Sequence, residues 1–311
     1  MSRVTVRTPV VRYRDGSFSH RPDTVAGEEP LEIRIGGQPF TTTMRTPGAD
    51  IELVHGLLHA EGIIAGPDDV RSARYCTGVG PDGRNTYNVL EVALADPAAL
   101  ARVRPRQQVT TSACGVCGAE SIDAITRSGR YPPGSIVLAP DSVSALPARL
   151  RAHQRTFRST GGVHAAALAT TEGLVEEVRE DVGRHNAMDK VIGAALLARR
   201  LPLADRALVT SSRASFELVQ KAVLAGAGML IAVSAPSSLA VQLAQEAGLT
   251  LIGFTSASGF NIYSGAWRIV GATNSVGSGA QGGPPSNPIG RVVSGRRLRS
   301  PGGCVHWRPH K

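Results

Sequence analysis

The sequence contains no long hydrophobic run. Nowhere in its 311 residues is there an unbroken apolar stretch of about 18 residues, the length at which a segment becomes a candidate for a membrane-spanning helix. The N-terminal stretch MSRVTVRTPVVRYRDG also lacks the apolar core of a secretory signal. We therefore expect a soluble, cytoplasmic protein without a membrane span.

Cysteine is scarce, and its positions are uneven. The four cysteines are Cys76, Cys114, Cys117 and Cys304, and only Cys114 and Cys117 lie close together, as C-x-x-C. In a chain without an export signal this spacing indicates a reducing compartment, where such a pair is more often catalytic or metal-binding than a structural disulfide.

Lysine is nearly absent, and one end of the chain has no acidic residue. The net charge is +9, but residues 270–311 carry six basic side chains and no acid, which leaves +3 for residues 1–269. This remainder is ordinary, so a basic DNA-binding face is unsupported and we expect no nucleic-acid partner. Residues 270–311 also hold nine glycines and five prolines without periodicity, which predicts a disordered basic tail.

The stretch around the cysteine pair reads TTSACGVCGAESID. Gly115 and Gly118 flank the cysteines, and a helical spacing of apolar residues follows them. The pattern predicts a loop that enters a helix N-terminus, a position that lowers the pKa of a thiol from roughly 8.5 and favours the reactive thiolate.

Four interpretations of the pair compete. A structural disulfide or two buried thiols fit poorly with flanking glycines, and zinc would need about four ligands although no second C-x-x-C exists. A thioredoxin-like pair normally follows a strand, which the preceding RPRQQ does not resemble. A sulfur carrier would hold a persulfide on one thiolate. The residues alone do not separate the last two interpretations.

The first third of the chain predicts β-structure with one helix. Strands are expected at residues 4–13, 70–76 and 86–95, and a hairpin at residues 31–44 turns at Gly36 and Gly37. Asp50 is predicted to cap a helix whose apolar face contains Leu53, Val54 and Leu57.

The second half alternates strands and helices. Helices are expected at 143–157, from 181 onward, 216–225 and 239–247, with strands at 174–178, 206–210, 229–234 and 249–254. From residue 206 the alternation becomes regular, and there it predicts a parallel sheet with both faces covered and a ligand at the carboxyl ends of its strands. Those ends carry SSR (Ser211, Ser212 and Arg213) and SAPSS, and FNIYSG is expected after the last strand. Hydroxyls and Arg213 suit an anion, and the alternative is that the serines only cap helices, at about 1 kcal/mol each.

Two further candidates lie between these elements. Arg184 and His185 are expected in the first turn of a helix, where they either contact a ligand or belong to a solvated helix start. His164 lies between a Gly-Gly-Val segment and a run of alanines. A histidine with C-x-x-C also suggests a zinc deaminase. That signature needs a glutamate two residues after the histidine, where this chain has Ala166. It also places the histidine before the cysteine pair, whereas in this chain the cysteine pair comes first.

Six segments in order resemble the formate dehydrogenase accessory sulfurtransferase family (FdhD-type). They are MRTPGADIELVHGLLHAEGII, SACGVCG, STGGVHAA, EDVGRHNAMDKVIG, SSRASFELVQKA and FNIYSG. The resemblance implies a protein that accepts sulfur from a cysteine desulfurase as a persulfide. It implies that the sulfur passes to the molybdenum bis-guanine-dinucleotide cofactor, which formate dehydrogenase requires. A homodimer is the corresponding expectation for assembly.

The same resemblance implies roles for individual residues. Cys114 would carry the persulfide and Cys117 would assist it, with no zinc. The cofactor would contact the segment made of Phe260, Asn261, Ile262, Tyr263, Ser264 and Gly265. The residue-level reading adds Ser211, Arg213, Arg184 and His185 as cofactor-binding candidates.

The expected fold is α/β, or α+β overall. A β-rich N-terminal domain, residues 1–128, would end in the cysteine loop and helix, and residues 129–269 would form a three-layer domain similar to cytidine deaminases, followed by the tail at 270–311. Two rival functions are a chaperone that delivers the molybdenum cofactor without moving sulfur, and a thiol–disulfide oxidoreductase that needs both cysteines.

Overall fold

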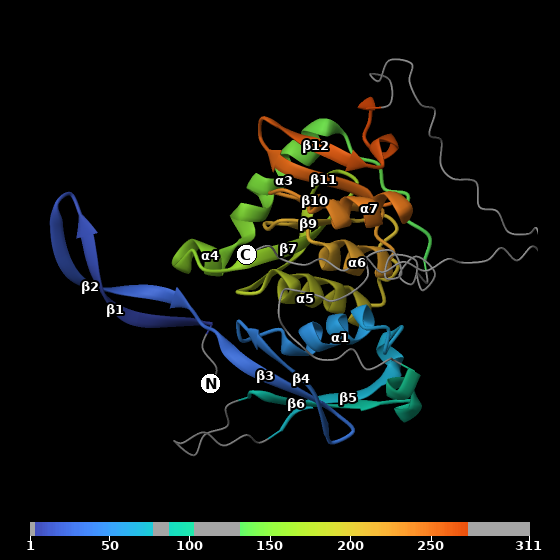
Figure 1. Cartoon of the computed structure of the whole chain (residues 1–311), viewed down its shortest axis with the longest axis horizontal. Helices are drawn as coiled ribbons and strands as arrows, with labels where there is room; N and C mark the ends of the chain where they lie inside the picture. Colours follow the sequence, from blue (N-terminus) through green and yellow to red (C-terminus); the bar gives the residue numbers. More distant parts are fainter. Residues whose placement is uncertain (1–3, 77–86, 103–130, 273–311) are drawn as a thin grey trace, which may run out of the picture. The chain divides into compact units, whose positions relative to one another are not determined.

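A computed structural model describes residues 4–76, 87–102 and 131–272, and its strands lie in three sheets (Figure 1). The strands are β1 Thr5–Arg14, β2 Ser17–Ala26, β3 Glu29–Ile35, β4 Gln38–Arg45, β5 Val70–Tyr75, β6 Val89–Leu94, β7 His164–Ala169, β8 Val175–Asp181, β9 Ala207–Thr210, β10 Met229–Ala232, β11 Thr250–Ser256 and β12 Gly259–Ser264. The α-helices are α1 Asp50–Ala60, α3 Pro140–His153, α4 Arg155–Thr160, α5 Arg184–Leu197, α6 Phe216–Leu224 and α7 Ser238–Glu246. Short 3₁₀ helices cover Pro67–Asp69, Pro97–Arg102 and Ala266–Arg268.

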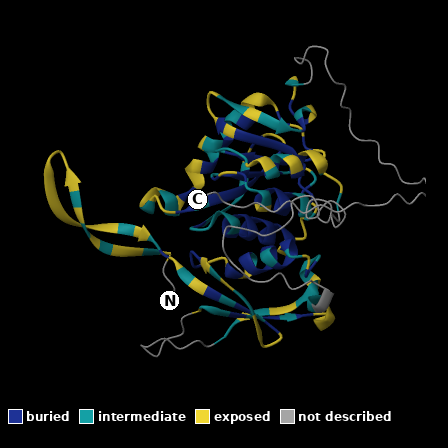
Figure 2. Cartoon of the chain, in the orientation of Figure 1, coloured by how far each residue is buried: buried dark blue, intermediate teal, exposed yellow. Residues whose placement is uncertain are grey.

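The N-terminal strands form two separate sheets. β1 and β2 make an antiparallel hairpin whose surface is mostly exposed in Figure 2, and the sequence had indicated only its first strand. The expected hairpin at residues 31–44 is confirmed as β3 and β4, which join β6 and β5 in the order β4-β3-β6-β5. Helix α1 covers this sheet, because Leu53, Val54 and Leu58 pack with Leu31 and Leu90 in one core.

The expected role of Asp50 as a helix cap is wrong. Ala49 occupies the cap position in a left-handed conformation, with φ of 55°, and Asp50 is the first residue of α1. The Asp50 carboxylate instead accepts hydrogen bonds from Arg45 Nη2 at 2.9 Å and from the Tyr75 hydroxyl at 3.0 Å. Burial and the neighbouring Asp50 charge raise the pKa of Tyr75 to about 12. The carboxylate therefore neutralises the fully buried Arg45.

The second half of the chain builds a six-stranded sheet in the order β12-β11-β10-β9-β7-β8. The prediction of a parallel sheet is confirmed for β9, β10 and β11. The flanking strands β12, β7 and β8, for which no parallel pairing was predicted, pair antiparallel. Residues of β9 and β10 are buried on both faces, as expected of strands in the centre of a covered sheet.

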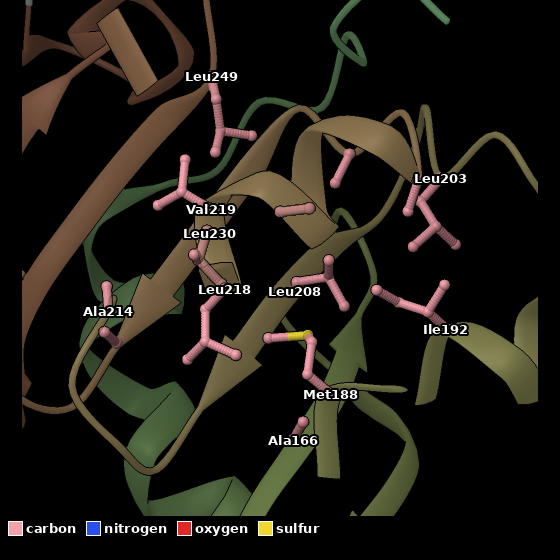
Figure 3. Packing of buried hydrophobic residues seen from close by; sticks show 14 of the residues in the cluster. Ala166, Met188, Ile192, Leu203, Leu208, Ala214, Leu218, Val219, Leu230 and Leu249 are labelled. Atoms are coloured by element: carbon pink, nitrogen blue, oxygen red, sulfur yellow. The ribbon is translucent and has the colours of Figure 1, made fainter. Parts of the chain in front are cut away.

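Helices cover both faces of this sheet. On one face α5, α6 and α7 bury a cluster that includes Met188, Ile192, Leu208, Leu218 and Leu230 (Figure 3). On the other face α3 contributes Val143, Leu146 and Leu150 against alternate residues of the same strands. The helix expected at 143–157 is divided, since α3 ends at His153 and α4 begins at Arg155. The apolar alternation of the strands thus produces a three-layer arrangement.

Helices α1 and α5 connect the two large sheets through a close backbone contact. A Cβ placed on Gly56 would lie 1.9 Å from the carbonyl oxygen of Asp189, and one on Gly193 would lie 1.8 Å from that of Glu52. Only glycine at these two positions permits this approach. α5 is consequently enclosed, and every residue from 186 to 196 is buried.

The fold class is therefore confirmed as mixed α/β with a β-rich N-terminal region. The similarity of the second domain to cytidine deaminases, which the family resemblance implies, stays a prediction. The expected domain boundary between residues 128 and 129 and nearly all of the expected tail lie outside the described residues, so both stay predictions. Where the chain is described, none of its helices is long and apolar enough to cross a membrane.

Candidate functional site

The two cysteines singled out by the sequence, Cys114 and Cys117, lie in residues 103–130, outside the described part of the chain. Their predicted roles stay predictions. Cys76, which is described, is a free and partly buried thiol. The structure therefore bears on the residues expected to bind the cofactor.

The carboxyl end of β9 carries two of these residues. Ser211 continues the pairing with β7, since its N–H donates to the carbonyl of Ala165 at 2.9 Å and its hydroxyl accepts from the Ala165 N–H at 2.9 Å. The Ser211 hydroxyl thus positions the start of β7, where His164 lies. Arg213 is exposed two residues further on.

The beginnings of α5 and α6 meet beside this strand end. His185, in the first turn of α5, places its Nε2 atom 2.8 Å from Glu217 Oε2 and 3.2 Å from the Ser215 hydroxyl. Ser215 is the cap residue of α6, and Glu217 lies in its first turn. The structure therefore brings together Arg184 and His185 of α5 with the start of α6, close to the end of β9.

The electrostatics show that these groups interact. The hydrogen bond with His185, aided by the nearby charge of Arg184, lowers the pKa of Glu217 to about 2 despite its partial burial. Burial lowers the pKa of His164, and the positive charges of Arg184 and His185 lower it further. Three basic side chains, His164, Arg184 and His185, therefore share one region with the carboxylate of Glu217.

Arg184 has one group that is left without a partner. Its Nε atom is buried and makes no hydrogen bond with any described residue. A buried donor without an acceptor costs about 1–3 kcal/mol. A ligand that brings a hydrogen-bond acceptor to this atom would therefore be stabilised here. Sequence reasoning had found Arg184 and His185 but missed Ser215 and Glu217, whose signal was a serine and a carboxylate at a helix start in SSRASFELVQKA.

The FNIYSG segment, which the sequence placed after the last strand, itself adds a further strand to the sheet. It forms β12, an edge strand that pairs antiparallel with β11. Phe260 is near the carboxyl end of β11, whereas Gly265 is at its amino end and accepts a hydrogen bond from the Thr250 hydroxyl at 2.7 Å. Ser264 is also used structurally, since its hydroxyl donates to the carbonyl of Leu249 at 2.6 Å.

These positions separate the predicted cofactor residues. Asn261 is exposed on β12, whereas Ile262 and Phe260 pack against the α3 side of the sheet and Tyr263 against the other side. β12 is three strands from β9, a separation of about 14 Å at the usual strand spacing. The first part of FNIYSG therefore lies at the same sheet edge as Ser211 and Arg213, while Ser264 and Gly265 do not.

Polar side chains buried behind the site hold the start of α5. Asp181 accepts from Lys190 Nζ at 2.7 Å, from the Thr46 N–H at 3.1 Å and from Asn186 Nδ2 at 3.1 Å. Lys190 also donates to the carbonyl of Thr46 at 2.8 Å. The network thus connects the segment after β4 to the beginning of α5, and it orients Arg184 and His185.

We expect Asp181→Asn to destabilise the protein by about 3 kcal/mol, because it leaves the Lys190 ammonium buried without a countercharge. The side chains of Asp181 and Lys190 are 0% and 2% exposed. Urea unfolding measures the change. The matched control is Asp205→Asn, whose carboxylate pairs with Arg206 but is 73% exposed, and it should change stability by less than about 0.5 kcal/mol. Equal stability of the two variants would contradict this account of the network.

A cleft of about 510 Å³ lies on another side of the same network, between the segment after β4 and strand β8. Most of its charged side chains already form ion pairs or hydrogen bonds within the protein. Arg179 pairs with Glu52 and Glu177, and Glu180 accepts from the backbone of Thr156 and Phe157. We assign this cleft no ligand.

Comparison with known families identifies the chain. The sequence model of the FdhD/NarQ family matches residues 26–270, which include both large sheets and the cluster at the starts of α5 and α6. The chain belongs to the FdhD/NarQ family. The match begins at the last residue of β2 and leaves out most of the β1–β2 hairpin and the residues after 270.

Family members of known name are similar over most of the chain. A sulfur carrier protein FdhD from Nocardia farcinica is 56% identical over 269 residues, covering 86% of this chain and 95% of that protein. Its counterpart from Corynebacterium efficiens is 57% identical over 251 residues, covering 79% and 90%. The chain thus spans nearly the whole length of these FdhD proteins.

A solved structure shares the FdhD/NarQ fold. It is described as a "putative formate dehydrogenase accessory protein" from Desulfotalea psychrophila, with a TM-score of 0.67 and 22% identity, covering 86% of this chain and 100% of that one. At this identity the likeness establishes the fold. It supports the arrangement of sheets given above.

The prediction of no zinc is not settled by the structure. Among the described residues no group of three or more His, Cys, Asp and Glu side chains is placed to hold a metal ion. Cys114 and Cys117 lie outside that set, so the absence of zinc at the cysteine pair stays a prediction.

Proposed function

We propose that this protein is a sulfur carrier that acts in the maturation of formate dehydrogenase. The observation that carries the proposal is the 56% identity to a sulfur carrier protein FdhD over 95% of that protein's length. The C-x-x-C, in which a glycine follows each cysteine, supports it, since a carrier needs an accessible thiolate. The proposed setting is the cytoplasm, with a cysteine desulfurase as donor.

The proposed chemistry is a transfer of sulfane sulfur. The Cys114 thiolate attacks the outer sulfur of the desulfurase persulfide, the S–S bond of that persulfide breaks, and the desulfurase thiolate leaves. Cys114 then carries the persulfide, and no net oxidation has occurred. The attacking group has to be a thiolate, because the protonated thiol is a poor nucleophile.

Release of the sulfur is assigned to Cys117. Its thiolate attacks the Cys114 sulfur that bears the sulfane, a Cys114–Cys117 disulfide forms, and the sulfur departs at the level of sulfide toward the molybdenum. The two electrons come from the pair of cysteines, and a cellular dithiol must then reduce the disulfide. This step gives both cysteines of the motif a function.

The proposed sulfur acceptor is the molybdenum bis-guanine-dinucleotide cofactor, bound as substrate. Phe260 and Asn261 of β12 and Arg184, His185, Ser211 and Arg213 lie along the carboxyl edge of the central strands. A cofactor with two nucleotide arms is long enough to span the about 14 Å between β12 and β9. A homodimer is part of the proposal, and formate dehydrogenase is the recipient of the sulfurated cofactor.

Intact-protein mass spectrometry tests the carrier function. After incubation with a cysteine desulfurase and cysteine, we expect one added sulfur, about 32 Da, that peptide mapping places on the peptide with Cys114 and Cys117. Dithiothreitol should remove it. A protein that binds the cofactor but never gains this mass would instead be a delivery chaperone, and one that only exchanges disulfides would be an oxidoreductase.

A further inference from the structure

The β1–β2 hairpin has one apolar face and one polar face. Its strands pair along ten residues each, and residues opposite each other lie on the same face. One face carries three such pairs, which are Pro9 with Pro22, Val11 with His20, and Tyr13 with Phe18. On the other face Arg12 and Arg14 lie opposite serines. This alternation is typical of a sheet that buries one face and exposes the other to water.

The apolar face of the hairpin is nevertheless open to solvent. Val11 is 58% exposed, Tyr13 63% and Phe18 75%. The ring centroids of Tyr13 and Phe18 are 5.0 Å apart, so the two rings form one aromatic surface beside the turn. A hollow of about 520 Å³ along the hairpin includes Pro9 and Pro22 in its lining. Exposed apolar patches on soluble proteins mark interaction sites.

The hairpin is suited to docking by this face and not by the addition of a strand. Both strands are edge strands, and Pro9 and Pro22 each lack the N–H group that a further strand would need. A two-stranded hairpin is marginally stable by itself. A partner that packs on the apolar face would therefore also stabilise the hairpin.

The size of the face favours a transient partner. Ten residues on each of two strands give a face of about 300 Å² at the usual strand dimensions. A stable interface buries about 800 Å² per partner. A permanent dimer held by this face is therefore disfavoured, whereas a complex that forms and dissociates fits its area.

The charge of the hairpin narrows the choice further. It carries four arginines, at positions 7, 12, 14 and 21, against the two carboxylates of Asp15 and Asp23. A surface that bears carboxylates is complementary to this charge. The C-terminal residues 270–311 hold six basic side chains and no acid, so their charge would be repelled and they are a poor occupant.

We propose that the apolar face of the β1–β2 hairpin docks a transient protein partner whose apolar groove is rimmed by carboxylates, and that this partner is the sulfur donor. The inference rests on the proposed function for the identity of the donor, a cysteine desulfurase. A donor binds and leaves once for each sulfur that it delivers, so its docking face is open between deliveries. Tyr13 and Phe18 anchor the complex, and the arginines accelerate the encounter.

Surface plasmon resonance of the full-length protein on an immobilised, purified cysteine desulfurase tests the docking face. We expect Phe18→Ser to weaken binding about 30-fold, mainly through faster dissociation, because it removes an aromatic anchor. Phe18→Leu keeps an apolar side chain and should retain most of the affinity. The matched control is Leu174→Ser, which removes an apolar side chain that is 58% exposed between β7 and β8 and should leave binding unchanged.

The charge of the hairpin is tested by a second variant that leaves the apolar face intact. We expect Arg12→Glu combined with Arg14→Glu to slow association about tenfold at low salt, because steering depends on charge. The difference from the wild type should vanish at high salt, where the charges are screened. Thermal unfolding of each variant establishes that the protein is folded.

Four results would overturn the proposal. The desulfurase does not bind the wild type, or it binds Phe18→Ser as tightly as the wild type. Phe18→Ser converts a dimer to a monomer in analytical ultracentrifugation, which makes the face a dimer interface. Vesicles of phosphatidylcholine and phosphatidylglycerol bind the wild type but not Phe18→Ser, which makes it a membrane-binding face.

Sulfur loading at increasing desulfurase concentration separates the docking face from the carrier function. Phe18→Ser should need about 30 times more desulfurase for half-maximal loading and still reach the wild-type rate at saturation, since only binding has changed. A wild type that gains no sulfur refutes the carrier function. Equal concentration dependence of the two proteins refutes only the docking face.

Discussion

Cys114→Ala is expected to abolish formate dehydrogenase maturation completely. The proposed carrier chemistry has no alternative nucleophile at this position, since an alanine has no thiolate to attack the desulfurase persulfide. The measurement is formate dehydrogenase activity in cells that lack the native gene and express the variant. The same variant should gain no sulfur by mass spectrometry.

The Cys117→Ala variant separates the two cysteines. It keeps Cys114, so it should still gain about 32 Da of sulfane sulfur, but it should release that sulfur slowly because the second thiol is missing. Cys76→Ser is the matched control, as Cys76 is a free thiol distant in sequence from the motif, and it should retain activity. Maturation by the Cys114→Ala protein at the wild-type level would refute the persulfide proposal.

Gly193→Ala is expected to destabilise the protein by more than about 4 kcal/mol, a size that single substitutions reach only exceptionally. The added Cβ would lie 1.8 Å from the carbonyl oxygen of Glu52. A backbone atom cannot turn away as a side chain can, so α1 and α5 would have to separate and expose the cores on both sides. Thermal or urea unfolding measures the loss.

The control for this prediction is Gly66→Ala. Gly66 is extended, with φ of −148°, and a Cβ there would meet no atom within 4 Å. Its stability should change by less than about 1 kcal/mol. If the Gly193→Ala protein were as stable as Gly66→Ala, the close contact of α1 and α5 would not be present in solution. Gly56→Ala should behave like Gly193→Ala, because its Cβ would lie 1.9 Å from the carbonyl of Asp189.

Local patterns predicted most of the elements, for identifiable reasons. The apolar residues of α5 recur at helical spacing, and Met188, Val191 and Ile192 are buried as expected. β9, β10 and β11 are short apolar runs between helices, and they pair in parallel. In both cases the signal is the spacing of apolar side chains, which depends only on neighbours along the chain.

The patterns misled where partners are remote in sequence. Asp50 looks like a cap but binds Arg45 and Tyr75. FNIYSG was placed after the last expected strand, yet β11 supplies the hydrogen bonds that make it a further strand. A solvated helix start was one of two interpretations for the beginning of α5, but Asn186, Asp189 and Lys190 of this helix are all buried. Lys221 pairs with Asp189 at 2.6 Å from another helix.

The sequence by itself determined the family, the alternation of strands and helices, and the cysteine pair as the centre of the proposed chemistry. Residue types and their order carry that information without any contact being known. Only the tertiary structure decided which candidates lie together, because His164, Arg184, His185 and Glu217 come from three elements that the sheet and α5 bring side by side. Their electrostatic influence on one another follows from that proximity, and no spacing along the chain encodes it.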